Sequence, residues 1–523
     1  MTMQRLLLLH FDAVHMAVLL LMELLNFLTK LCPTWATTMI SPSSQRERRR
    51  TERDIPGPGP ALPVLGTRWI YSIFGPYKMN QIHEAYRDMF RKYGSIVRER
   101  ALWNFPVVSL LEQRDIEVVF KHQSKFPLRP PTEVLAWYRQ SRPDRYTTLG
   151  LINEQGEKWH MLRSVLTPEL TSAKTIQRFL PELNQVVEDF MSFLRTTRDK
   201  HGVISGFEEL ANRMGLESTC TLILGRRMGF LEHEVDAKAC RLGAAIKGHF
   251  CASRDTFYGL PFWKVFPTRS YKLFVESEEK IYDIVSEMVE SALTEEREMC
   301  SVDAVSSVFM SILNAPGLDV REKKAAVIDF IAAGMQTLGN TLVFVLYLMA
   351  KNPRVQKRLY EEILQVAPGR CPLTAETLRQ ATYLQACIME AFRVLPTTPC
   401  VARILESEME LSGYHVSAGT VVLCHTWLAC QEEVNFTAAH EFLPERWLQQ
   451  GEVTRINPFL VVPFGLGRRV CPGKRFVEQE LHLALAKIVR EFHVDFEGEL
   501  ELQFEFILCP KAPANFIFHD RQE

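Results

Sequence analysis

Apolar residues recur at helical spacing along much of the chain. The spacing predicts an amphipathic helix over residues 79–93, a short helix over 115–122, predominantly helical structure over 175–350, and another helix from Phe476. Strand-like segments are fewer and short. They are residues 96–100, 107–111, a turn and strand over 395–403, and a hairpin of 502–506 with 515–518 around 507–510. The pattern therefore predicts a mainly α fold with small β-sheets.

The longest apolar segment covers residues 327–350 and ends at Asn352-Pro353. Its length would permit a membrane span, but uncompensated polar side chains inside lipid are costly. The polar positions are Asp329, Gln336, Thr337, Asn340 and Thr341. We therefore expect a helix buried at the centre of the protein. Residues 126–149, by contrast, are rich in proline and arginine without a helical period, and we expect a loop there.

Residues 1–54 look like a targeting or membrane-associated segment. No uninterrupted apolar run reaches the ~18 residues of a spanning helix, and serines and an arginine cluster follow. This composition favours a mitochondrial transit peptide, although its acidic residues also leave an endoplasmic-reticulum signal anchor open. The proline-rich residues 55–60 predict a stiff hinge, and the folded domain is expected over 61–523.

One loop stands apart from these patterns because it presents a single cysteine between glycines and basic residues. Cys471 follows Gly465 and Gly467, and Gly473 precedes the helix that includes Phe476. Neighbouring positive charge and a helix N-terminus both favour a thiolate. The basic residues are Arg468, Arg469, Lys474 and Arg475. A lone thiolate suits an axial haem ligand better than a zinc or iron–sulfur site.

Composition narrows the function classes further. The net charge of −1 gives no global footprint for nucleic acid, and no nucleic-acid partner is expected. The twelve cysteines include no CxxC pair. This spacing argues against a disulfide framework and for a reducing compartment.

The cysteine loop resembles the haem-thiolate signature of the cytochrome P450 family. The residues that carry the resemblance are Phe464, Gly467, Arg469, Cys471 and Gly473. The family implies an α-helical haem domain with a β-rich lobe, haem b as cofactor, and Cys471 as the axial ligand of the iron. It further implies that the haem is held by Arg469, Arg403, Trp159, Arg163, Phe464 and Gly465.

The central helix resembles the oxygen-handling part of this family. Thr337 would supply a hydroxyl for proton delivery, and small residues such as Ala333 would make room for dioxygen. The family usually has an acid where this chain has Gln336, which can order water but cannot donate a proton as a carboxylic acid. The alternative is a mid-helix threonine that hydrogen-bonds its own backbone.

Other motifs have implied structural or substrate roles. Glu390, Arg393 and Arg446 match the family's buried charge network, whose role is structural. Thr398, Val401 and Ile507, together with Ala333, would line the substrate pocket, and residues 126–149 would cap it. An aromatic segment, residues 257–264, would touch the membrane.

The resemblance also implies partners. Lys474 and Arg475 resemble the site at which mitochondrial members accept electrons from an acidic, adrenodoxin-like ferredoxin, supplied by ferredoxin reductase and NADPH. Residues 213–231 and 334–341 resemble a steroid-hydroxylating branch of that clade. We therefore expect a monooxygenase of the inner mitochondrial membrane that consumes O2 and a steroid.

Two alternatives remain open at this point. One is a microsomal enzyme that hydroxylates fatty acids or xenobiotics with a flavoprotein reductase, in the endoplasmic-reticulum membrane. The other, of a different class, is a haem-thiolate isomerase or sensor that does not hydroxylate.

Overall fold

The structure is a computed structural model that describes residues 49–232, 237–298, 307–369, 371–448 and 456–521. The calls on residues 1–48 lie outside the described residues. The helices are α2 Ile82–Tyr93, α3 Gln113–Lys121, α4 Glu133–Ser141, α5 Gly150–Asn153, α6 Gly156–Leu166, α7 Pro168–Thr171, α8 Ala173–Arg178, α9 Leu180–Thr197, α10 Phe207–Leu224, α11 Ala237–Tyr258, α12 Arg269–Glu298, α13 Ser307–Leu313, α14 Val320–Lys351, α15 Pro353–Val366, α16 Ala375–Gln380, α17 Thr382–Val394, α18 Thr426–Ala429 and α19 Lys474–Glu491.

Strands and single-turn helices are short. The strands are β1 Ile96–Arg100, β2 Pro106–Leu110, β3 Val203–Ile204, β4 Val401–Ile404, β5 Met409–Leu411, β6 Tyr414–Val416, β7 Val421–Cys424, β8 Phe492–Phe496, β9 Leu502–Phe504, β10 Leu508–Pro510 and β11 Phe516–Asp520. The 3-10 turns used below are η1 Glu52–Asp54, η2 Arg68–Tyr71, η5 Pro261–Lys264, η7 Pro444–Trp447 and η8 Gly467–Arg469. The predicted fold class, mainly α with small sheets, is confirmed.

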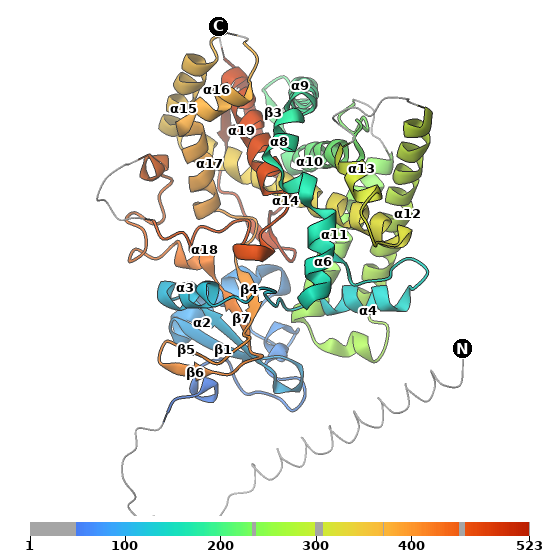
Figure 1. Ribbon diagram of the computed structural model, residues 1–523. Coiled ribbons are helices and arrows are strands. Elements are labelled where there is room, and N and C mark those ends of the chain that lie inside the picture. The colour runs from blue at the N-terminus through green and yellow to red at the C-terminus, as the bar shows by residue number, and fades with distance from the viewer. Residues whose placement is uncertain (1–48, 233–236, 299–306, 370, 449–455, 522–523) are drawn as a thin grey trace, which may run out of the picture.

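A β-rich lobe lies beside a larger helical body (Figure 1). The lobe contains a four-stranded sheet in the order β1-β2-β7-β4, in which β2 and β7 run parallel and the other pairs antiparallel. Apolar side chains of α3 and of this sheet form one core, which includes Ile116, Val108 and Val422.

The helical body is organised around α14. Its apolar segment is long enough to cross a membrane, but 72% of that window is buried inside the protein. The helix packs closely on α10 through glycines. A Cβ at Gly339 would come within 2.8 Å of the Asn212 Cα, and one at Gly334 within 2.3 Å of the Thr219 Oγ1. The small residue at 334 therefore lets two helices approach, a use that differs from the expected space for dioxygen.

Two sequence-based expectations about secondary structure differ from the structure. Residues 126–149 contain the helix α4, although no helical period was evident there. The expected hairpin of 502–506 with 515–518 is wrong. β9 pairs with β10, with Leu508 opposite Phe504, whereas β11 pairs with β8 and β3. The reason is packing: Phe516 and Phe518 pack at a tilt against Phe207 of α10, with ring centroids 4.9 and 5.4 Å away.

The proline-rich residues 55–60 lie against β1. Ile55 is buried in the lobe core, and the Arg98 N–H donates to the Pro56 carbonyl at 2.8 Å. A Cβ at Gly57 would come within 1.9 Å of the Arg98 carbonyl oxygen, so only glycine permits this approach. Just before this segment, Thr51 forms an isolated parallel β-bridge with His415 of β6.

Candidate active site

The cysteine loop is a tight turn between η8 and α19. The Cys471 N–H donates to the Phe464 carbonyl at 2.9 Å, and the Val470 N–H donates to the Gly467 carbonyl at 3.1 Å. Gly465 and Gly467 have φ angles of +73° and +71°, which L side chains rarely adopt. The loop geometry thus requires these glycines and holds Cys471 immediately before the α19 N-terminus.

Burial dominates the acidity of the cysteine. It raises the pKa of the Cys471 thiol, while the N–H groups of Gly473 and Lys474 and the charge of Arg163 act to lower it. The four adjacent basic residues are not the main source of stabilisation, since Arg468, Lys474 and Arg475 are exposed to solvent. A coordinated metal cation reverses this balance, because a thiol bound to such an ion gives up its proton.

Guanidinium groups gather near the loop, and none of them pairs with a carboxylate of the residues that the structure describes. Arg163 of α6 donates to the Val470 carbonyl at 2.9 Å, and Arg403 of β4 donates to the Leu466 carbonyl at 3.1 Å. Arg469 donates to the carbonyls of Pro127 and Glu154 at 3.0 and 2.8 Å. Its guanidinium lies 3.9 Å above the ring of Trp159.

Sequence reasoning missed a fourth arginine, Arg129. Arg129 is exposed, yet the protein around its guanidinium lowers the pKa of that group by desolvation. Among the described residues no side-chain hydrogen bond or ion pair of Arg129 is present. The only available signal was an arginine set between prolines, in Pro127-Leu128-Arg129-Pro130-Pro131.

These four cations destabilise one another. Burial lowers the pKa of Arg469 to about 9, and the charges of Arg129, Arg403 and Arg163 lower it further. Burial also lowers the pKa of Arg403 to about 10, and Arg129 adds to that effect. Buried charges need a counter-charge, so the cluster is suited to a ligand with more than one negative group. The carboxylates of haem meet this requirement.

The central helix has an accessible stripe in its buried middle. Ala333 is exposed and Phe330 and Thr337 are partly exposed, although Ile331, Met335 and Leu338 are buried. These residues are spaced three and four apart and share one helix face, so this face borders internal space. With the cysteine and the arginine cluster, the donor set fits a flat, anionic haem.

Thr337 and Gln336 differ in their surroundings. The Thr337 hydroxyl donates a hydrogen bond to the Ala333 carbonyl at 2.7 Å, as in the alternative in which a mid-helix threonine bonds its own backbone. The hydroxyl oxygen can still accept a hydrogen bond from another group. Gln336 is buried, and no described residue donates a hydrogen bond to its side-chain oxygen. The assignment of both to proton delivery stays a prediction.

The buried charge network expected from the sequence is formed between α17 and the turn η7. Arg393 donates to both oxygens of Glu390, at 2.7 and 2.9 Å. Arg446 and Trp447 of η7 donate to Glu390 at 2.8 and 2.9 Å. Glu390 and Arg393 are fully buried. Because every polar atom of the carboxylate is used, the network joins two segments and has no free group for chemistry.

The residues expected to line the substrate pocket come from several elements. The turn that contains Ile507 lies against the segment that follows α17, because the Leu508 N–H donates a hydrogen bond to the Thr397 carbonyl at 2.8 Å. Val401 and Ile507 are buried, and Thr398 is partly exposed. Their role as pocket residues stays a prediction.

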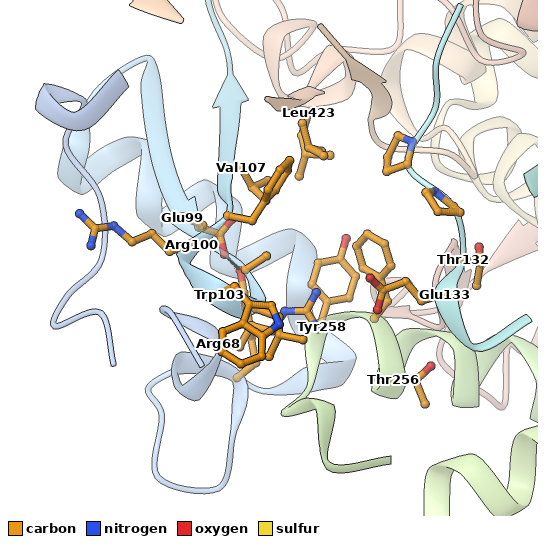
Figure 2. Close-up of a pocket in the computed structure, with 18 of the residues that line it drawn as sticks. Arg68, Glu99, Arg100, Trp103, Val107, Thr132, Glu133, Thr256, Tyr258 and Leu423 are labelled. Carbon is orange, nitrogen blue, oxygen red and sulfur yellow. Dashed lines mark hydrogen bonds between the residues drawn. The ribbon is translucent and has the colours of Figure 1, made fainter. Parts of the chain in front are cut away.

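A cavity of about 480 Å³ lies between the β-rich lobe and the helices α4 and α11 (Figure 2). None of Ala333, Thr398, Val401 and Ile507 lines it. Its walls include side chains of β1 and η2, which sequence reasoning did not assign to a site, and of the start of α4, which belongs to the residues 126–149 expected to cap the substrate pocket. Phe257 and Lys264, in the segment expected to touch the membrane, also line it.

No group of three or more histidine, cysteine or acidic side chains in the described part of the chain is arranged to hold a metal ion. The cysteines there are free thiols. Cys471 is thus suited to act alone as a protein ligand, as haem requires.

Comparison with known proteins agrees with this site. Residues 56–518 match the cytochrome P450 family. The chain is 47% identical to ecdysone 20-monooxygenase of Drosophila melanogaster over 496 residues, which cover 92% of this chain and 91% of that protein. It is 32% identical to the mitochondrial cytochrome P450 302a1 of the same organism, over 89% of this chain and 95% of that protein.

A vertebrate relative is more distant. The chain is 30% identical to the mitochondrial 1,25-dihydroxyvitamin D(3) 24-hydroxylase of Mus musculus, over 85% of this chain and 84% of that protein. The family match over residues 56–518 spans the cysteine loop, the central helix and the buried charge network. The chain belongs to the cytochrome P450 family, and it is a haem-dependent monooxygenase.

Proposed function

We propose that the chain hydroxylates ecdysone at position 20, with haem b as its cofactor. The observation that carries this proposal is the 47% identity to ecdysone 20-monooxygenase over 92% of the chain. The cavity of about 480 Å³ is of a size that suits a small apolar ligand such as a steroid.

The residues divide the work as follows. When bound, haem would supply the chemistry that places one oxygen atom of O2 in a C–H bond of the substrate, with two electrons and two protons reducing the other to water. Cys471 would hold the iron as a thiolate and donate electron density to it. Arg129, Arg163, Arg403 and Arg469 would neutralise the haem carboxylates. The Thr337 hydroxyl holds a proton on the accessible face of α14.

We further propose that electrons come from a small acidic ferredoxin, reduced by ferredoxin reductase and NADPH. Lys474 and Arg475 support this, because both are exposed in the first turn of α19. Basic residues at a helix N-terminus oppose the helix dipole, at a cost of about 0.3–1 kcal/mol each. Exposed cations in the first turn of α19 therefore suit an anionic partner.

We place the enzyme at the inner mitochondrial membrane. Two of the relatives above are named mitochondrial. Exposed apolar side chains next to the cavity suit contact with lipid; they include Phe74, Phe105, Phe262, Val265 and Phe266.

A Soret titration of the purified ferric protein tests the substrate without any redox partner. We expect a saturable high-spin shift with ecdysone and none with cholesterol or lauric acid. A shift with lauric acid alone would replace the steroid by a fatty acid. Turnover with a flavoprotein reductase but not with ferredoxin would reject the proposed electron donor, and product formed without O2 would reject hydroxylation.

A further inference from the structure

The cavity between the lobe and α11 is lined by apolar and polar side chains. Val107, Leu423 and Phe257 supply apolar surface, and Glu99 of β1 lines the cavity together with tyrosines. The tyrosines are Tyr71, Tyr86 and Tyr258. Figure 2 shows Glu99 and Tyr258 on one side and Thr132 and Glu133 on another. A ligand in the cavity therefore meets hydrogen-bonding groups from several elements.

Glu99 has one carboxyl oxygen without a partner. Its side chain is 7% exposed. Its Oε1 accepts a hydrogen bond from the Tyr71 hydroxyl at 2.7 Å, but its Oε2 is buried and has no hydrogen-bond partner in the described part of the chain. Buried polar atoms are nearly always satisfied, so an exception at a cavity wall calls for a ligand.

Two other buried glutamates show what a purely structural carboxylate looks like here. Glu390 accepts hydrogen bonds on both oxygens, from Arg393 and from η7. Glu217 likewise accepts from Arg227 and the Met228 N–H on Oε1 and from the Phe230 N–H on Oε2. Unpartnered oxygens also occur at Glu322 and Glu480, but within the described residues only Glu99 combines such an oxygen with a position on the cavity wall.

The surrounding charges favour a neutral ligand over a cation. Within the described residues, Glu99 forms no ion pair within 4 Å. Arg68 lines the same cavity, and its charge already acts on Glu99. Lys264 and Glu133, on the opposite side, pair with each other at 2.7 Å. Burial raises the pKa of Glu99, and the hydroxyls of Tyr71 and Tyr86 and the charge of Arg68 lower it.

We propose that Glu99 determines specificity by accepting a hydrogen bond from a hydroxyl group of an otherwise apolar, steroid-sized ligand in this cavity. The inference rests on the proposed function, the hydroxylation of the bound steroid. It adds a reason why a hydroxylated steroid is preferred to one without hydroxyl groups, since a site built to bond a hydroxyl rejects an analogue that lacks it.

The test compares two steroids by isothermal titration calorimetry on the haem-loaded protein. Ecdysone carries hydroxyl groups, whereas progesterone carries only ketones and cannot donate a hydrogen bond. In Glu99→Met, which keeps the side-chain length, we expect ecdysone affinity to fall about tenfold or more and progesterone affinity to change less than about threefold. Glu99→Gln, whose amide can donate or accept, should restore most of the ecdysone affinity and strengthen progesterone binding.

A matched control is Glu322→Gln. Glu322 is also buried with an unpartnered oxygen, but it does not line the cavity. This variant should bind both steroids as the wild type does. Equal losses for ecdysone and progesterone in Glu99→Met, or no loss for ecdysone, would overturn the proposal.

Infrared difference spectroscopy keeps the test open if Glu99→Met does not fold. Ecdysone should shift a carboxyl band of the wild-type protein that is absent from Glu99→Gln, and progesterone should leave it in place. No such shift would overturn the inference. If the Glu99 variants change ecdysone affinity as expected but the wild type forms no 20-hydroxylated product, only the proposed function is rejected. If the wild type forms this product but the Glu99 variants bind both steroids as it does, only the inference is rejected.

Discussion

Thr337 lies where the central helix borders internal space, and its hydroxyl is the group that the proposed chemistry needs. We expect Thr337→Val, which removes the hydroxyl and keeps the shape, to consume NADPH at a similar rate while product per NADPH falls several-fold and hydrogen peroxide rises. The measurement is the ratio of product to NADPH in reconstituted turnover.

Thr341→Val is the matched control one turn along α14. The Thr341 hydroxyl bonds to Thr397 at 2.8 Å and is buried. Coupling should stay near the wild-type value in this variant. If Thr337→Val also kept full coupling, another group, such as Gln336 acting through water, would guide the proton.

Glu480 links stability to pH. It is buried on α19 and accepts a hydrogen bond from Ser218 of α10. Burial raises its pKa from 4.5 to about 8, against the hydrogen bond from Ser218. The folded state therefore binds one more proton than the unfolded state between these values, and the free energy of unfolding falls as pH rises through this window.

We expect Glu480→Gln to flatten that slope between pH 5 and pH 8, because the amide does not titrate. Chemical denaturation of the haem-loaded protein across this pH range measures the slope. Glu322→Gln, a substitution at another buried carboxyl on α14, should keep the wild-type slope. An identical slope in Glu480→Gln and wild type would refute the assignment.

At the scale of elements, the contact of α10 with α14 depends on glycine. Replacing an exposed helical glycine with alanine normally stabilises a helix by ~1 kcal/mol. At Gly339 we expect the opposite, a loss on the order of 1–3 kcal/mol, because the added Cβ would lie 2.3 Å from the Asn212 Oδ1 and 2.8 Å from its Cα.

Denaturant unfolding of Gly339→Ala measures this loss. Gly243→Ala on α11 is the control, since its Cβ would meet only the flexible Met335 Cε at 2.9 Å. Similar stability changes in the two variants would mean that α10 and α14 separate easily and that their close approach contributes little.

For the molecule as a whole, the exposed start of α19 is the surface proposed to meet the ferredoxin. Lys474 is partly offset by Glu478, at 3.8 Å, whereas the structure gives Arg475 no such pair. We expect Lys474→Glu with Arg475→Glu to raise the KM for ferredoxin about tenfold at low salt and to change kcat little, because charge at a surface acts mainly on encounter.

The effect should shrink as salt rises, since screening acts over about 10 Å at 0.1 M. Turnover against ferredoxin concentration at several ionic strengths provides the measurement. Lys272→Glu with Lys280→Glu, at exposed positions on α12, should leave the KM unchanged. A KM in the α19 variant that equals wild type at every salt concentration would place docking elsewhere.

The sequence by itself determined the fold class, the buried central helix and the cysteine loop. Each depends on local spacing: apolar periodicity in α14, and glycines around Cys471 that only a tight turn requires. Tertiary structure decided the rest. It paired β9 with β10 because Phe516 and Phe518 pack on α10. It also brought Arg129, Arg163, Arg403 and Arg469 to one region and placed Glu99 on a cavity wall, since such clusters depend on which distant segments meet.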